Sequence, residues 1–162
     1  MEDELSGLET GLGSLLSVET RRLQPLPDPA YAFDPRRRQY NSVETMRAFA
    51  AAAPPGDSKV IGITSRDLFI PMLTFVFGQA QLGGRLALVS LARLRQEFYG
   101  LPPDAAVARA RALKEAVHEL GHTFGLAHCP DPLCAMSLSV DIRQVDAKRA
   151  SYCESCWTAA AP

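Results

Sequence analysis

The chain has almost no net charge and no long apolar run. Its 162 residues include seventeen basic and eighteen acidic side chains, which leave a formal charge of −1 at pH 7. This balance gives no overall attraction to a nucleic-acid backbone or to an anionic membrane surface. The longest apolar stretches are broken at residues 66–67 and 83–85, short of the ~20 residues that span a bilayer. We therefore expect a soluble protein that binds neither nucleic acid nor membrane.

The first residues also lack the features of a secretory signal. Glu2, Asp3 and Glu4 make the start acidic, whereas a signal peptide has a positively charged start, an apolar run and small residues at its cleavage site. This predicts a cytoplasmic location. In that reducing compartment, cysteines bind metal or do redox chemistry more often than they form disulfides.

Histidine and cysteine are scarce, and both are confined to the last part of the chain. All three histidines lie between residues 118 and 128, and all four cysteines lie between residues 129 and 156. Imidazole nitrogens and thiolate sulfurs are common ligands of zinc. Their crowding makes this part of the chain the place to look for metal sites.

The patterning of the remaining residues predicts an α+β fold in a single domain, residues 1–162. A helix over residues 42–53 can be capped by Asn41 or Ser42 and is stopped by the prolines and glycine of residues 54–56. Short apolar runs between turn signals predict strands. We place a buried central strand at residues 60–64 and two further strands at residues 73–77 and 85–90, joined through Gly83 and Gly84.

Three segments before residue 42 show weaker patterns. Residues 1–13 have no clear periodicity and are expected to form a loose N-terminal arm, and residues 15–18 could begin a strand. The stretch 25–41 contains four prolines. Because proline removes a hydrogen-bond donor and fixes the backbone, this stretch is expected to be an ordered surface loop without regular structure.

A longer amphipathic helix is predicted after Asp104, which can serve as its N-cap. Its apolar residues recur at the spacing of one helical face: Leu113, Val117, Leu120 and Phe124. His118 and His122 point to nearly the opposite side. One face of this helix therefore packs on the core, and the other is free for a site.

Residues 118–122, HELGH, form an HExxH motif. Histidines four positions apart on a helix project side by side and can share one zinc ion. Glu119 is turned aside from them, so it suits a different role, that of a base taking a proton from a water activated by zinc. Taken alone, the motif could also place His118 and His122 as ordinary residues on the polar face of a helix.

His128 is the candidate for the third ligand that a catalytic zinc requires. On a continuous helix it would point about 240° away from His122, too far round to reach the same metal. The helix must therefore end, and Gly125 is placed to end it, because glycine adopts positive φ without a Cβ penalty. The resulting string, HExxHxxGxxH, matches the extended zinc motif of metzincin peptidases.

The cysteines form two close pairs, Cys129 with Cys134 and Cys153 with Cys156. Two such pairs separated by a loop can form a tetrahedral thiolate cage for a structural zinc, whose binding would stabilise the fold. A disulfide, a thioredoxin-like redox pair and an iron–sulfur cluster are the alternatives. Structural zinc is favoured, because the sequence lacks both a secretion signal and the strand-then-helix setting of a redox pair.

Together these motifs resemble those of one family, the archaemetzincins, whose signature joins HExxHxxGxxxC to CxxxxCxM and a final CxxC. This chain reads HELGHTFGLAHCPDPLCAM from His118 to Met136 and CESC from Cys153 to Cys156. Upstream, DLFIPMLTFVFGQA and GRLALVSLARL are similar to the strands of the family, so the resemblance covers about two thirds of the chain. The loop between Met136 and Cys153 is about one residue shorter than in the family, a change that a loop can absorb.

The resemblance implies a metzincin-like fold with a mixed, twisted β-sheet, an antiparallel edge strand, an active-site helix and a C-terminal zinc-bound cysteine segment. It makes Met136 the methionine of a turn beneath the catalytic zinc. It also places the edge strand at residues 85–90, where an extended peptide could add as a further strand. A plain hairpin strand is the alternative for that segment.

We therefore expect a monomeric, zinc-dependent metallopeptidase that binds two zinc ions and cleaves peptide or protein substrates. Glu119 would be the general base. The catalytic zinc would be held by His118, His122 and His128, and the structural zinc by Cys129, Cys134, Cys153 and Cys156. Two alternatives stay open: a zinc-stabilised binding module without catalysis, and a zinc hydrolase of a non-peptide amide.

Overall fold

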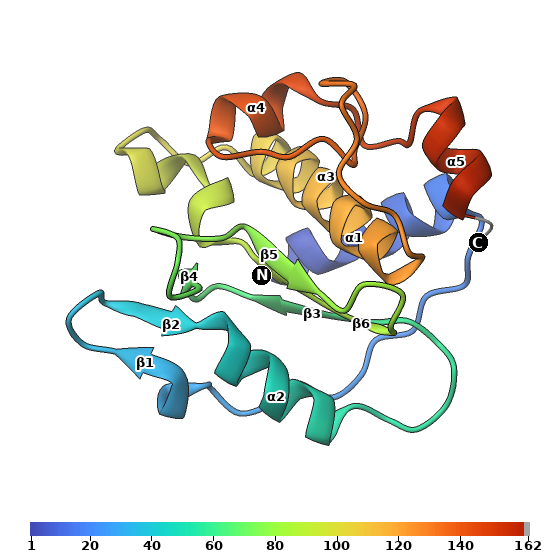
Figure 1. Ribbon diagram of the computed structural model, residues 1–162. Coiled ribbons are helices and arrows are strands. Elements are labelled where there is room, and N and C mark those ends of the chain that lie inside the picture. The colour runs from blue at the N-terminus through green and yellow to red at the C-terminus, as the bar shows by residue number, and fades with distance from the viewer. Residues whose placement is uncertain (161–162) are drawn as a thin grey trace.

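A three-stranded sheet lies at the centre of the computed structural model, which describes residues 1–160 (Figure 1). The strands run in the order β3 (Val60–Thr64), β6 (Leu86–Ser90) and β5 (Gly78–Ala80). β3 is parallel to β6, and β5 is antiparallel to it. The structure thus has the mixed sheet with an antiparallel edge strand that the sequence predicts.

The position of the edge strand differs from the prediction. Residues 85–90 were expected at the edge, but β6 lies in the centre, and each of its residues is buried between β3 and β5. Residues 60–64, expected in the centre, form the outer strand β3. Residues 73–77 precede the strand β5 and contribute only an isolated bridge between Leu68 and Val76. Strand order depends on pairing between distant segments, which apolar runs alone do not specify.

A second small sheet contains the order β1 (Phe33–Asp34), β2 (Gln39–Asn41) and β4 (Leu68–Phe69). The expectation of an irregular loop over residues 25–41 is therefore wrong from residue 30 onward, where the 3-10 turn η1 (Ala30–Ala32) precedes β1 and β2. All four prolines of the stretch lie outside β1 and β2. The missing donor and fixed φ of a proline act at its own position, so residues between prolines can still pair in short strands.

Helices cover both faces of the central sheet (Figure 1). α2 (Ser42–Ala52) lies on one face, and α3 (Ala105–Thr123) lies on the other beside α1 (Glu2–Leu16). The predicted N-caps of α2 and α3 are confirmed. The Asn41 side chain accepts a hydrogen bond from the Val43 amide at 3.0 Å, and that of Asp104 accepts one from the Ala106 amide at 2.9 Å.

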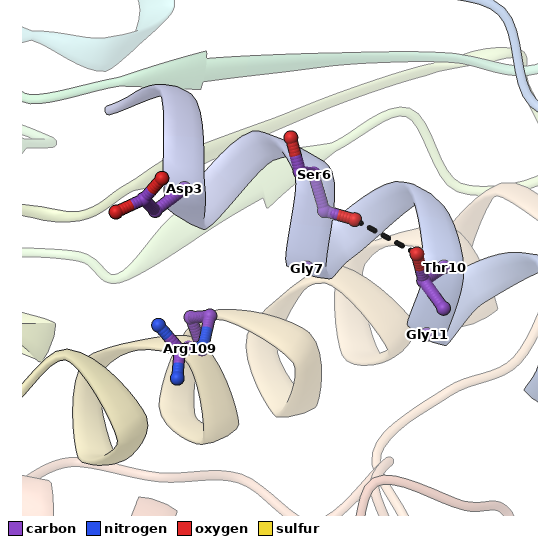
Figure 2. A pocket seen from close by; sticks show the side chains of 6 residues that line it. All are labelled: Asp3, Ser6, Gly7, Thr10, Gly11 and Arg109. Carbon is purple, nitrogen blue, oxygen red and sulfur yellow. Dashed lines mark hydrogen bonds between the residues drawn. The ribbon is translucent and has the colours of Figure 1, made fainter.

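The N-terminal segment is part of the core, which corrects two expectations. Residues 1–13 are not a loose arm and residues 15–18 do not begin a strand, because the chain is helical to Leu16. Leucines spaced four apart bury one stripe of α1 in the core: Leu8, Leu12 and Leu16. Gly7 and Gly11 face α3 (Figure 2), and a Cβ atom on either would lie 2.8 Å from a side chain of that helix. The same glycines that obscure the helix in the sequence allow its close packing.

The remaining helices are short and lie in the segments before and after α3. They are η2 (Ala92–Leu94), η3 (Gln96–Tyr99), α4 (Ile142–Ala147) and α5 (Glu154–Ala160). In the part of the chain that the structure describes, no helix combines the length and apolar character needed to span a bilayer.

Candidate metal centre

The second half of α3 carries the HELGH motif and is buried on both sides. Val117 and Leu120 are buried in the core as predicted, and Leu113 and Phe124 pack partly against it. His118 and Glu119 are themselves only 5% exposed. The polar side of the helix is therefore covered by other segments of the protein, which argues against an ordinary solvated face.

The chain turns at Gly125 as the sequence predicts. α3 ends at Thr123, and Gly125 has a φ of +88°. The Leu126 amide donates to the Gly121 carbonyl and the Gly125 amide to the His122 carbonyl, both at 3.0 Å, which is the pattern of a Schellman helix end.

The turn brings the third histidine back to the first two. The ring centroid of His128 lies 5.3 Å from that of His118 and 4.9 Å from that of His122. One metal-binding atom from each of the three rings can be chosen so that all lie within 4.8 Å of one another.

Hydrogen bonds orient the two helical imidazoles. Nδ1 of His118 lies 2.8 Å from the Ala135 carbonyl oxygen, and Nδ1 of His122 lies 2.7 Å from the Leu126 carbonyl oxygen. A carbonyl only accepts, so each Nδ1 carries the proton, and in a neutral ring Nε2 keeps its lone pair. The two Nε2 atoms face each other at 3.2 Å. Two lone pairs at this distance repel unless a cation lies between them.

The separation of these nitrogens fits zinc. Nitrogen ligands around a tetrahedral zinc ion lie about 3.3 Å apart, given the usual bond length. Burial lowers the pKa of His118 to about 3, and burial is also the main cause that lowers the pKa of His128. Both rings are therefore neutral at pH 7, the form in which imidazole binds a metal.

Glu119 lies beside the histidines on the buried side of α3. Burial raises the pKa of its carboxyl group, the nearby carboxylate of Glu115 raises it further, and Lys148 opposes the shift. A carboxyl group whose pKa is moved from its usual range towards neutrality is suited to proton transfer.

The four cysteines form a second cluster next to the first. Their sulfur atoms all lie within 4.8 Å of one another, and those of Cys129 and Cys153 are 3.8 Å apart. Sulfur ligands of a tetrahedral zinc ion are separated by about 3.8 Å. Burial raises the pKa of the Cys134 and Cys156 thiols, so the four sulfurs ionise together only when a cation compensates their charge.

Met136, which the resemblance makes the methionine of a turn beneath the catalytic zinc, packs against Gly121 of the HELGH motif. Its side chain is fully buried, and a side chain on Gly121 would collide with its sulfur atom. The backbone on either side of Met136 supports both clusters. The Ala135 carbonyl orients His118, and the Met136 carbonyl accepts a hydrogen bond from the Cys129 amide at 2.9 Å.

The turn between β5 and β6 is fastened to the end of α3. The Gly83 amide donates to the His122 carbonyl at 2.8 Å. The Lys59 ammonium donates to the Gly84 and Thr123 carbonyls at 2.7 and 2.8 Å. A cation at the C-terminal end of a helix also interacts favourably with its dipole.

Two buried charges next to the site were not foreseen from the sequence. The Lys148 ammonium lies 2.8 Å from Glu115 Oε1, and the side chains are 0% and 4% exposed. Glu115 precedes His118 by three positions, which places it on the same helical face. The spacing between Glu115 and His118 is visible in the sequence. The partner of Glu115, Lys148, lies far along the chain, and no local pattern indicates that the two residues meet.

Comparisons with known proteins agree with this arrangement. Residues 55–160 match the model of Peptidase family M54. The chain is 48% identical over 128 residues to the archaemetzincin of Methanocaldococcus jannaschii, which covers 79% of this chain and 69% of that protein. It is 44% identical over 127 residues to the archaemetzincin of Pyrococcus horikoshii, which covers 78% of this chain and 68% of that protein.

Solved structures show the same likeness over nearly the whole chain. The crystal structure of the archaemetzincin from Methanopyrus kandleri superposes with a TM-score of 0.87 at 36% identity, over 99% of this chain and 85% of that one. The archaemetzincin from Archaeoglobus fulgidus, solved in complex with malonate, has a TM-score of 0.82 at 33% identity, over 96% and 91% of the two chains. Sequence and fold thus point to the same group of proteins.

Proposed function

Since the chain belongs to the archaemetzincins, Peptidase family M54, and is a zinc metallopeptidase, we propose that its three histidines hold the catalytic zinc and that Glu119 is the general base. The observation that carries this proposal is the 3.2 Å separation of the Nε2 atoms of His118 and His122. Each ring is held in this orientation by a hydrogen bond from its Nδ1 atom to a backbone carbonyl. His128 completes a three-nitrogen set, which leaves one tetrahedral position open for chemistry.

The residues around this set would carry out peptide hydrolysis. A zinc ion held by His118, His122 and His128 would lower the pKa of a water molecule and polarise a carbonyl group. Glu119 takes a proton as the water oxygen attacks the carbonyl carbon. It then gives that proton to the amide nitrogen as the carbon–nitrogen bond breaks.

We propose that the substrate binds to β5 as an added strand. The Phe77 carbonyl accepts from the Ser90 amide and the Gln81 amide donates to the Leu86 carbonyl, so the odd-numbered residues of this segment pair with β6. In an antiparallel pair the alternate residues direct their backbone groups away from the partner strand. Gly78 and Ala80 therefore present theirs to the open edge. An extended peptide can use such groups for main-chain hydrogen bonds.

The cysteine cluster is proposed as a structural zinc site. Cys129, Cys134, Cys153 and Cys156 would supply four sulfur ligands to such a zinc, which would leave no position for a substrate. α1 packs into the same core as α3 through Leu8, Leu12 and Leu16, so we propose that residues 1–162 act as one domain. We propose that the second zinc contributes to the stability of this domain.

The peptidase proposal is tested by incubating the purified protein with peptide libraries of several lengths and analysing the products by mass spectrometry. We expect cleavage of internal or terminal peptide bonds, loss of cleavage after treatment with a chelator, and recovery when zinc is added back. Zinc that remains bound while no peptide is cleaved would instead indicate a zinc-stabilised binding module.

Replacing Cys153 by serine separates the two proposed metal sites. We expect the zinc content to fall by about one ion per chain and the melting temperature to drop, because a structural zinc contributes its binding free energy to folding. The matched control is Ser155→Ala on the exposed side of the same CxxC segment, which should keep both zinc ions. Two zinc ions retained in the Cys153→Ser protein would reject a four-sulfur site.

A further inference from the structure

Gly78 lies against the proposed general base. It is the first residue of β5. A Cβ atom built on Gly78 would lie 2.5 Å from Oε1 and 2.7 Å from Cγ of Glu119. Carbon atoms do not approach a neighbour this closely, so any side chain at this position would displace the Glu119 carboxyl group or the strand.

The surroundings of β5 show why this contact concerns the reaction. Successive side chains of a strand point to opposite faces of its sheet. Gln79 is directed towards α2, where its side chain is hydrogen-bonded to the Ser42 hydroxyl. The α-carbon of Gly78 therefore faces α3 and Glu119, while its backbone amide and carbonyl face the open edge. Gly78 alone therefore lies between the Glu119 carboxyl group and the peptide that is proposed to add to β5.

We propose that Gly78 is a positioning residue for peptide hydrolysis: because it has no side chain, the Glu119 carboxyl group lies directly against the strand that holds the substrate. This inference rests on the proposed function and adds a residue to it. With a methyl group at position 78, the base and the bound peptide carbonyl must move apart by about the width of that group. A misplacement of about 1 Å can lower the rate of a reaction roughly a hundredfold.

The first test is the Gly78→Ala variant. We expect kcat to fall by roughly a hundredfold, while KM changes little because the backbone groups of the open edge remain, and zinc content stays at the wild-type value. Gly62→Ala on β3 is the matched control. The nearest atoms to its Cβ would be side-chain atoms of Leu88 and Phe49, at 3.2 and 3.3 Å, so it should keep kcat.

A second test does not depend on activity. A Cβ atom on Gly78 would also lie 2.6 Å from the Leu88 carbonyl oxygen, so a loss of stability alone does not identify Glu119 as the group it displaces. Glu119→Ala removes the Oε1 and Cγ atoms and leaves Leu88 unchanged. If Glu119 is displaced, Gly78→Ala should perturb the unfolding equilibrium constant roughly tenfold less in the Glu119→Ala background than in the wild type.

The outcomes distinguish this inference from the proposed function. An equal effect of Gly78→Ala on unfolding in both backgrounds would overturn the inference, because the strand alone would then be disturbed. A Gly78→Ala protein that folds only in the Glu119→Ala background would support it. Unchanged kcat in Gly78→Ala would overturn it as well. If the wild type itself cleaves no peptide, the proposed function fails, and the positioning role fails with it.

Discussion

The Glu119→Gln variant is expected to keep its zinc and to lose roughly a thousandfold in kcat. A positioned general base contributes about 10²–10⁴-fold to a rate, and glutamine cannot accept the proton of the attacking water. The amide has nearly the size of the carboxyl group, so it fits the space against Gly78. The histidines keep their carbonyl partners and therefore their orientation.

The measurement combines zinc analysis with steady-state kinetics on a cleaved peptide. Glu97→Gln, in the short helix η3 away from the histidines, is the control for the loss of one carboxylate and should retain wild-type rates. Wild-type kcat in Glu119→Gln would show that Glu119 is not the base. Loss of zinc in that variant would instead make Glu119 a ligand or a support for one.

Lys148→Met is expected to cost about 3–5 kcal/mol in the free energy of unfolding, because removing one member of a buried ion pair leaves the other charge uncompensated. The remaining charge would be the Glu115 carboxylate, whose side chain is 4% exposed. Its Oε1 atom has no aligned hydrogen bond within the described residues, so the Lys148 ammonium at 2.8 Å is its main compensation.

Denaturant unfolding at saturating zinc measures this cost. The double variant Lys148→Met/Glu115→Leu should recover most of the loss, since replacing both members of a buried pair by apolar groups is often neutral. The matched control is Arg143→Met in α4, because Arg143 pairs with Asp141 at the surface with its side chain 88% exposed. Exposed pairs contribute about 0–1 kcal/mol. An equal cost for Lys148→Met and Arg143→Met would show that the buried pair is not important for stability.

The clustering of the histidines and of the cysteines could be predicted from the sequence because its determinants are local. His118 and His122 lie four positions apart on one helix, and Gly125 reverses the chain through backbone conformation alone. The cysteine pairs lie within short segments, so their proximity follows once the intervening loop closes. The turn at Gly125 and the return of His128 towards the other two histidines are confirmed by the structure.

The rest of the fold depended on contacts between distant segments. The sequence contains three short apolar runs that can be strands, but it does not state which one lies in the centre, and the prediction placed β6 at the edge. α1 was missed because Gly7 and Gly11 have low helix propensity, although packing against α3 overrides it. Gly78 and Lys148 carry no local pattern, since each is explained by a side chain far away in the chain.

The fastening of the β5–β6 turn to the end of α3 has a mechanical consequence. Gly83 and Lys59 hold this turn to carbonyl groups of His122 and Thr123, so the strand and the helix behave as one rigid frame. We therefore expect the distance between Gly78 and Glu119 to vary little in the folded protein.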